Sequence, residues 1–443
     1  MDNFVGRRAR HTLRGMDRID ESHEPLVRLA DGTVKQVNPF SGTEVWTVPG
    51  RAHRPIPSPV PDVRDLAPGE ATRRCAFCEE RYVETTPESG RWIRSKAGWR
   101  YAEGLTLEEV LATPAEFRRV PNLFEILSFD FWYLNYGFTG SPLALAHQAT
   151  YLGTDAGRLH VVDLARIRLR AMDLPEADLP TTVEEIQARD PAILGSFFSG
   201  SHDVVIARRH YVSDATRTDQ LASAGTLTRD EHVAFIEATI ASAQALVTEN
   251  PHAHYVSIFQ NWLTPAGASF EHLHKQIVAI DTIGSRTRAE FERLRADPLL
   301  YQRWGPEFAR QHGLLIAENA YAVAFAGLGH RFPGVDIFTK VNGVPWELPP
   351  EVVQDWSDLL HACHAATGPL VPSNEEWHYQ PHTLPLAAPL RAVLKWRINN
   401  PAGFEGGTNV FINTLDPWAV AARVKAKLTE LRSAGRLGDL SIG

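Results

Sequence analysis

The sequence predicts an α+β fold made of two related halves in tandem, each an antiparallel sheet with packed helices. The first observation behind this prediction is a strand, a helix and two further strands in order between residues 202 and 280. The second is a similar order that returns after residue 320. Helices mixed with hairpin-linked strands in this way are typical of the α+β class.

The first half is read from residue 202 onward, where "HDVVIARR" alternates like a strand. Thr228 and Glu231 then form a capping box in front of an apolar repeat with helical spacing. Strands are expected at 254–261 and 272–280, on either side of a loop that contains Pro265 and Gly267.

The second half repeats these elements. Strands are expected at 321–327 and 335–341, followed by a helix over 349–366 that begins with prolines. The segment "WHYQPHTL" (377–384) is the expected late strand. A final helix runs from Asp416 and Pro417 to a stop at Gly435.

These elements suggest a domain organisation. Residues 1–35 are polar, without a period, and are interpreted as an N-terminal arm. A first domain spans 36–285 with an insertion near 130–200, because 172–195 is acidic and broken by prolines. A second domain spans 286–443.

Composition excludes several classes of protein. The net charge of −8 is spread without long runs, which argues against nucleic acid as the main partner. The sequence contains no run of about 18 apolar residues, so no membrane span is expected. The basic N-terminus is not followed by an apolar segment, so a secretory signal is not expected. Three cysteines do not make a disulfide framework, so a reduced, cytoplasmic location is expected.

The stretch "AGASFEHLHKQIVAID" carries the main candidate site. In a strand His272, His274 and Gln276 share one face, and such a face is costly to bury without partners. An isolated H-x-H is more often a solvated edge strand. The small residues Gly267 and Ser269 just before it allow close approach of a ligand, so a phosphate or metal site is favoured.

Cys75 and Cys78 form a C-x-x-C pair, a spacing that suits a tetrahedral zinc site. A redox pair and two buried thiols are the alternatives. No second C-x-x-C exists, so any other ligands must be histidines. No thioredoxin-like βαβ pattern surrounds Cys75, which disfavours an oxidoreductase.

Four motifs in order resemble the galactose-1-phosphate uridylyltransferase-like family of the histidine-triad superfamily. "IFQNWLTPAGASFEHLHKQIVA" resembles its active-site segment, with Leu273 in place of the usual proline. "NPFSGTEVWTVPGRAHRP" with the following "CAFC", "RVPNLFEIL" and "PAGFEGGTNVFIN" resemble its other motifs. The resemblance implies two tandem histidine-triad-like halves.

The resemblance implies a role for each matched residue. His274 is the nucleophile that accepts a nucleotidyl group, and Gln276 contacts the phosphoryl oxygens. The expected nucleotide and phosphate contacts are Arg51, Arg54, Asn122, Asn261, Gly267 and Ser269.

A structural zinc ion is implied, held by Cys75, Cys78, His210 and His272, with His202 as the competitor of His210. Some family members carry a second metal in the C-terminal half. Here Glu290 and His378 remain, but Gln380 stands where a histidine is needed, so that second metal is not expected.

The acceptor is left open. Asn399 stands where the family has a sugar-phosphate lysine, while Glu405 is kept as an acceptor contact. The favoured activity is transfer of UMP or another NMP between a nucleotide sugar and a phosphorylated small molecule. The alternatives are a nucleoside-diphosphate-sugar or dinucleoside-polyphosphate phosphorylase, and a non-catalytic zinc-stabilised nucleotide-binding protein. The family also implies a homodimer and a role in carbohydrate metabolism.

Overall fold

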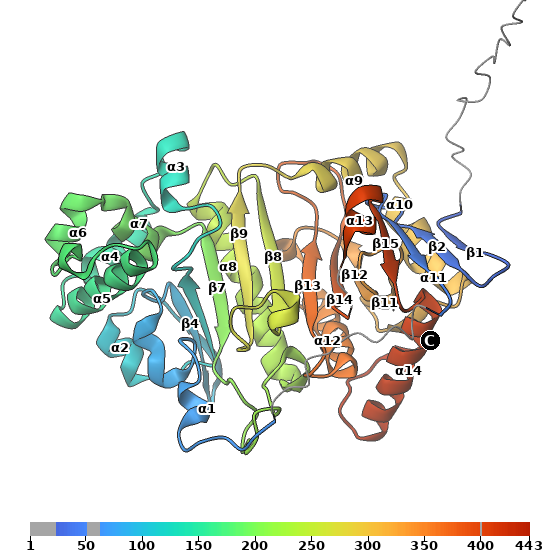
Figure 1. The fold of residues 1–443 in the computed structure, drawn as a ribbon, viewed down its shortest axis with the longest axis horizontal. Helices are drawn as coiled ribbons and strands as arrows, with labels where there is room; N and C mark the ends of the chain where they lie inside the picture. Colours follow the sequence, from blue (N-terminus) through green and yellow to red (C-terminus); the bar gives the residue numbers. More distant parts are fainter. Residues whose placement is uncertain (1–23, 51–62, 399–400) are drawn as a thin grey trace, which may run out of the picture.

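One continuous antiparallel sheet of twelve strands organises the molecule (Figure 1). The computed structural model describes residues 24–50, 63–398 and 401–443. The strand order is β16-β10-β11-β12-β14-β13-β8-β9-β7-β6-β4-β5, so the two chain halves meet where β8 pairs with β13. The predicted α+β class with two tandem halves is confirmed.

The N-terminal half contributes six strands and a long helix. They are β4 (Gly90–Ser95), β5 (Gly98–Ala102), β6 (Phe117–Pro121), β7 (His202–Ala207), α8 (Arg229–Glu249), β8 (Tyr255–Trp262) and β9 (His274–Ile280). The capping box of Thr228 and Glu231 forms as predicted and starts α8. α8 buries its apolar side against β7, β8 and β9, which places the helix on one face of the sheet.

The C-terminal half repeats this plan. Its elements are β10 (Leu315–Glu318), β11 (Ala322–Ala326), β12 (Gly334–Asn342), α12 (Pro350–Thr367), β13 (Ser373–His378), β14 (Pro389–Trp396), α14 (Pro417–Ser433) and β16 (Ser441–Ile442). The prediction of a late strand at 377–384 is wrong. β13 ends at His378, and β14 takes that place, buried along its whole length. Basic residues on β14 hid its strand character.

Buried polar contacts tie the two halves together. Lys275 of β9 is fully buried and its Nζ lies 2.5 Å from the Glu375 carboxylate of β13. His364 of α12 lies 2.6 Å from the other oxygen of the same carboxylate. A buried charge is tolerated only with such partners, so the halves are fixed at one register.

Helices fill the predicted insertion and gather at one end of the molecule (Figure 1). They are α3 (Phe129–Tyr136), α4 (Pro142–Tyr151), α5 (Asp155–Ala171), α6 (Val183–Arg189) and α7 (Pro191–Ser199). α4 to α7 contribute most of a separate apolar core. The remaining helices are α1 (Glu70–Arg73), α2 (Leu107–Ala112), α9 (Ser285–Ala296), α10 (Leu300–Gln302) and α11 (Phe308–Gln311). No helix among the described residues has the length and apolarity needed to cross a bilayer.

A small second sheet corrects the predicted arm. β1 (Leu26–Arg28), β2 (Val34–Val37), β3 (Glu44–Thr47) and β15 (Val410–Asn413) form it, beside the short helix α13 (Gly403–Thr408). Residues 24–35 are therefore not an irregular arm. Leu26 and Val34 are buried in this sheet, a pattern too short to detect as a period. Residues 1–23 lie outside the described residues.

Candidate active site and metal centre

The candidate site lies on the face of the sheet opposite α8. Lys275 points toward α8, with its Nζ 5.2 Å from the ring centroid of Phe235. Because side chains alternate along a strand, His274 and Gln276 point the other way. Directly paired residues share a face, so Ile206 lies beside His274 and Val204 beside Gln276. With Val120 and Phe77 these residues make an apolar patch next to His274.

His274 is oriented as a nucleophile. Its Nδ1 lies 2.6 Å from the carbonyl oxygen of His272 and donates to it. The ring proton is thereby held at Nδ1, which leaves the lone pair on Nε2. Burial lowers the pKa of His274 to about 4, so the imidazole is neutral at physiological pH. A neutral nitrogen held in this way can attack phosphorus.

His202 holds the amide of Gln276. The backbone N–H of Ile126 donates to His202 Nδ1 at 3.2 Å, so the proton of the neutral ring sits on Nε2. That nitrogen lies 3.1 Å from Gln276 Oε1 and donates to it. Burial lowers the pKa of His202 to about 4, which keeps the ring in this form. The oxygen of Gln276 is therefore engaged, and its NH2 group is the end left for a ligand.

Asn122 joins this network. Its Nδ2 lies 3.1 Å from His202 Nε2, and its Oδ1 accepts the backbone N–H of Phe124 at 2.9 Å. The amide orientation is fixed by that second bond. Since His202 Nε2 already carries a proton, it cannot accept a hydrogen bond from Asn122 Nδ2. The N–H groups of Asn122 therefore stay available to a ligand.

Four buried donors converge beside His274: Cys75, Cys78, His210 and His272. The two sulfur atoms are 3.8 Å apart. His210 Nδ1 lies 3.5 and 3.6 Å from the sulfurs of Cys75 and Cys78, and His272 Nδ1 lies 3.6 and 3.8 Å from them. A tetrahedral ion with zinc-like bond lengths separates sulfur atoms by about 3.8 Å and sulfur from nitrogen by about 3.6 Å. The donors fit such an ion.

The tautomers also suit a metal. His272 Nε2 donates to the carbonyl oxygen of Ala207 at 2.6 Å, which frees Nδ1 for the ion. Hydrogen bonding to Cys75 lowers the pKa of Cys78, so a thiolate is already favoured there. Of the two histidines weighed as the third ligand, His210 is in the cluster and His202 is not. His202 donates a hydrogen bond to Gln276 Oε1 instead.

The loop before β9 lies beside the site. Gly267 has a φ of +90°, and a Cβ there would lie 3.8 Å from Asn261 Nδ2. Asn261 Oδ1 accepts a hydrogen bond from Asn374 Nδ2 at 2.7 Å, so Asn261 is fixed from the C-terminal half. Ser269 is exposed, and its hydroxyl is open to a ligand.

Two aromatic residues of the site were missed by the sequence reasoning. Phe77, between the two cysteines, meets the His274 ring edge-on with 5.2 Å between centroids. Phe270 packs on Phe77 at 4.5 Å. Their position inside the C-x-x-C pair and directly before the histidines is the signal that could have identified them.

Glu290, one of the two residues that resemble a second metal site, belongs to a buried ion pair. Glu290 is buried and accepts hydrogen bonds from Arg391 and from the hydroxyl of Tyr301. His378 pairs with Arg391 in the strand register, and Gln380 donates to the carbonyl of Leu384 at 2.9 Å. The metal-competent group found among the described residues is the Cys75 cluster, not this one.

The remaining predicted residues are Arg51, Arg54, Asn399 and Glu405. Arg51, Arg54 and Asn399 lie outside the described residues. Glu405 lies on α13, where its carboxylate accepts the backbone N–H of Ala402 at 2.8 Å. Its role as an acceptor contact stays a prediction.

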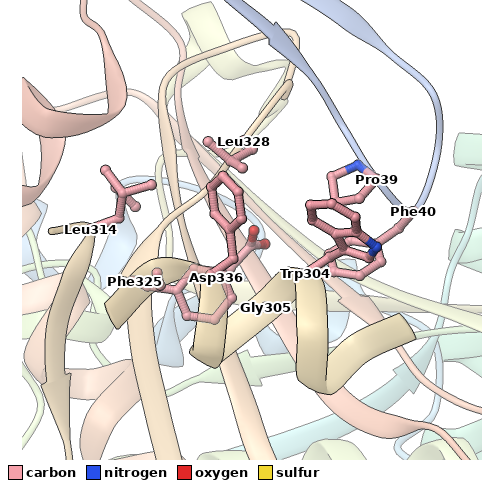
Figure 2. Close-up of a pocket in the computed structure, with 11 residues that line it drawn as sticks. Pro39, Phe40, Trp304, Gly305, Leu314, Phe325, Leu328 and Asp336 are labelled. Atoms are coloured by element: carbon pink, nitrogen blue, oxygen red, sulfur yellow. The ribbon is translucent and has the colours of Figure 1, made fainter. Parts of the chain in front are cut away.

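Cavities differ in size and in the face they open on. A groove of about 550 Å³ opens on the His274 face, where Phe259, Asn261 and Asn374 line it. A cavity of about 710 Å³ lies on the α8 side, lined in part by Gln244 and Glu249. A third, lined by Phe40 and Asp336 among others, measures about 10 Å³, room for about one water (Figure 2). Of these three cavities, the groove combines ligand-sized volume with the histidine face.

Comparisons with known proteins agree with this fold. A family model described as "Domain of unknown function (DUF4921)" matches residues 29–443. An ADP-glucose phosphorylase from Arabidopsis thaliana, solved with bound ADP-glucose, is similar at 17% identity and a TM-score of 0.57, covering 89% of this chain and 98% of that one. A GalT-like protein from Arabidopsis thaliana is similar at 17% identity and a TM-score of 0.52, covering 88% and 98%. No curated protein sequence matches. The likeness establishes the GalT-like fold that the motifs predicted.

Proposed function

Because the chain belongs to the DUF4921 family, whose description assigns no activity, we propose its function from its own site: it is a nucleotidyltransferase that works through His274. The observation that carries the proposal is the hydrogen bond from His274 Nδ1 to the His272 carbonyl. It leaves a neutral, correctly protonated imidazole beside an amide donor and an apolar patch. A pure binding protein has no need of such a nucleophile.

The reaction proceeds in two displacements. His274 Nε2 attacks the α-phosphorus of a nucleotide sugar, the bond to the leaving phosphate breaks, and a nucleotidyl-histidine forms. The phosphate of the acceptor then attacks that phosphorus and releases the histidine. The NH2 group of Gln276 donates to the phosphoryl oxygens, and its held amide oxygen keeps that group turned toward them.

The neighbouring residues bind the nucleotide. We assign Asn122, Asn261, Gly267 and Ser269 to contacts with the nucleotide, as the resemblance implies. Phe77, the partly buried residue packed on the core cluster of Val204 and Ile206, suits a contact with a base or ribose. Arg51 and Arg54 would add charge at the phosphates, as the resemblance implies.

We assign the Cys75 cluster to a structural zinc ion, since a Cys2His2 set is closed and typical of such sites. The ion would anchor the loop that carries Phe77 against His274. It would also fix His272, whose carbonyl receives the proton of His274. The chemistry itself belongs to the histidine, and the zinc acts by holding these groups in place.

The candidate reactions differ in the molecule that accepts the nucleotidyl group. A hexose 1-phosphate acceptor makes the protein a uridylyltransferase-like enzyme, and inorganic phosphate makes it a nucleotide-sugar phosphorylase. The "EGGTN" sequence near Glu405 and the loss of the lysine at Asn399 favour the phosphorylase direction. We also propose that the protein is a cytoplasmic homodimer that acts in carbohydrate metabolism.

The proposal is tested by trapping the intermediate. Purified protein is mixed with α-³²P-labelled UDP-glucose, ADP-glucose or GDP-mannose and quenched in alkali, in which a nucleotidyl-histidine survives. Label from one donor supports the proposal and names the base. Release of that label by phosphate or by hexose 1-phosphate then identifies the acceptor. Nucleotide binding without label from any donor favours the non-catalytic binder.

A further inference from the structure

The face that carries His274 continues across the junction of the two halves. Asn261 of β8 is paired with Asn374 of β13, and Asn374 with Lys395 of β14. Paired residues share a face, so these side chains lie in one row. The row forms part of the 550 Å³ groove, which is lined by Asn261, Asn374, Glu376 and Arg397 among others. The groove therefore extends from the nucleotide loop into the C-terminal half.

Hydrogen bonds link the side chains of this row to one another and to Arg397. Asn374 Nδ2 donates to Asn261 Oδ1 at 2.7 Å, and also to the carbonyl of Ala266 at 2.8 Å. Arg397 Nη1 donates to Asn374 Oδ1 at 2.8 Å. The guanidinium of Arg397 is thus held at a set position relative to the loop that precedes the catalytic strand.

Arg397 has no acidic partner among the described residues. Its guanidinium carbon lies 4.4 Å from the ring centroid of Phe332, and its Nε is buried without a hydrogen-bond partner. Glu376 is the carboxylate of the groove, and Lys395 already binds it at 2.6 Å. Arg397 is therefore the cation of the groove lining that has no ion-paired carboxylate of its own among the described residues. Burial lowers the pKa of Arg397, and the nearby Glu376 carboxylate offsets part of that shift.

We propose that Arg397 binds a second anionic group, a phosphate or a carboxylate, at the far end of the acceptor or leaving group. This inference rests on the proposed transfer through His274 and names its substrate class. Asn374 lies two strands from β9, a distance of about 10 Å at the usual strand spacing. The substrate is therefore a small phosphorylated molecule with anions at both ends: one reacts at His274 and the other pairs with Arg397.

The test measures discharge of the labelled enzyme by three acceptors: glucose 1-phosphate, glucose 1,6-bisphosphate and glucuronic acid 1-phosphate. A charged hydrogen bond predicts a discharge rate at low acceptor concentration about 10- to 100-fold higher for an acceptor with a second anion. Arg397→Gln removes that preference, and Arg397→Lys keeps part of it. The phosphate and carboxylate probes identify which anion is preferred.

A matched control is Arg331→Gln, because Arg331 also lies over an aromatic ring, Phe411, but is exposed and outside the groove. This variant keeps the preference. Equal rates for all three acceptors, or a preference that survives in Arg397→Gln, overturns the inference and leaves the transferase standing. If no donor labels the protein, the transferase proposal fails. Calorimetric binding of glucose 1,6-bisphosphate against glucose 1-phosphate to wild type and Arg397→Gln then decides the anion site separately.

Discussion

The two halves of the sheet hold the same strands but use the same face differently. In the N-terminal half β9 pairs with β7 and β8, and in the C-terminal half β14 pairs with β12 and β13 in the same way. On β9 this face carries His274 and Gln276 beside a groove. On β14 that face carries Arg391, which is buried under the rings of Phe40 and Tyr301.

The difference lies in how polar groups are satisfied. In the C-terminal half Arg391 is neutralised by Glu290, and the cavity lined by Phe40 and Asp336 measures only about 10 Å³ (Figure 2). In the N-terminal half His274, Gln276 and Asn122 each have one end bound to the protein and one end free. The C-terminal half uses this face for packing, and the N-terminal half leaves donors that we assign to a ligand.

The largest expected effect separates the nucleophile from its counterpart. His274→Asn removes the attacking nitrogen, so covalent labelling falls by about 10³-fold or more. His378→Asn, on the matching face of the C-terminal half, still forms the adduct, since His378 lines the groove but does not supply the attacking nitrogen. Labelling rates from rapid quench measure both. Equal losses in the two variants would erase the distinction between the halves.

Metal binding is the second difference. Cys75→Ala removes one of four ligands, so metal content falls from about one ion per chain to none, and labelling falls because the Phe77 loop and His272 lose their anchor. Cys363→Ala is the control, because Cys363 is also buried but lies alone on α12. Mass spectrometry measures the metal content of the wild type and of both variants. A metal content unchanged by Cys75→Ala contradicts the assigned ligands.

The ion pair of the C-terminal half gives the complementary test. Glu290→Gln strands the buried Arg391 guanidinium, so the free energy of unfolding falls by about 3–5 kcal/mol while metal content stays constant. Adding Arg391→Met to that variant removes the stranded charge and restores part of the stability. Urea unfolding measures both. Loss of metal in Glu290→Gln would place a second ion there and contradict the comparison.

Much of this contrast could be predicted from the N-terminal half and little from the C-terminal half. His272, His274 and Gln276 are neighbours in sequence, and their spacing shows their chemistry. Arg391 is 101 residues from Glu290, so a reader of the sequence takes it for a surface charge. The strand that carries it was missed for that reason. The sequence left His202 as a competitor of His210, because His202 begins β7 and His210 follows it, and only the fold shows which one meets the cysteines.

A smaller effect is expected from the residue that orients Gln276. His202→Phe keeps a ring but removes the donor to Gln276 Oε1, so labelling slows by about tenfold. In a Gln276→Ala background the same change has little further effect, because both act through one amide. The control is His361→Phe, a buried histidine in α12 whose Nε2 donates to the Leu227 carbonyl. Multiplicative losses in the double variant would mean that His202 acts independently of Gln276.

The smallest effect is a pH dependence that both halves share. Burial lowers the pKa of His202 and of His361 to about 4. In the pH range between that value and about 6.5 the unfolded chain binds more protons than the folded one. Stability from these groups is therefore full above about pH 6.5 and is lost as the pH falls toward 4. Unfolding midpoints between pH 4 and 8 measure the slope, and His361→Gln makes it shallower.

The most direct test of the account is to locate the nucleotidyl group by peptide mapping of the trapped protein under alkaline conditions. The account predicts an adduct of one nucleoside monophosphate on the peptide that contains His274, and none on the peptide that contains His378. An adduct on any other histidine, or a donor that turns over while His274 stays unmodified, would contradict the assignment of the chemistry to the N-terminal half.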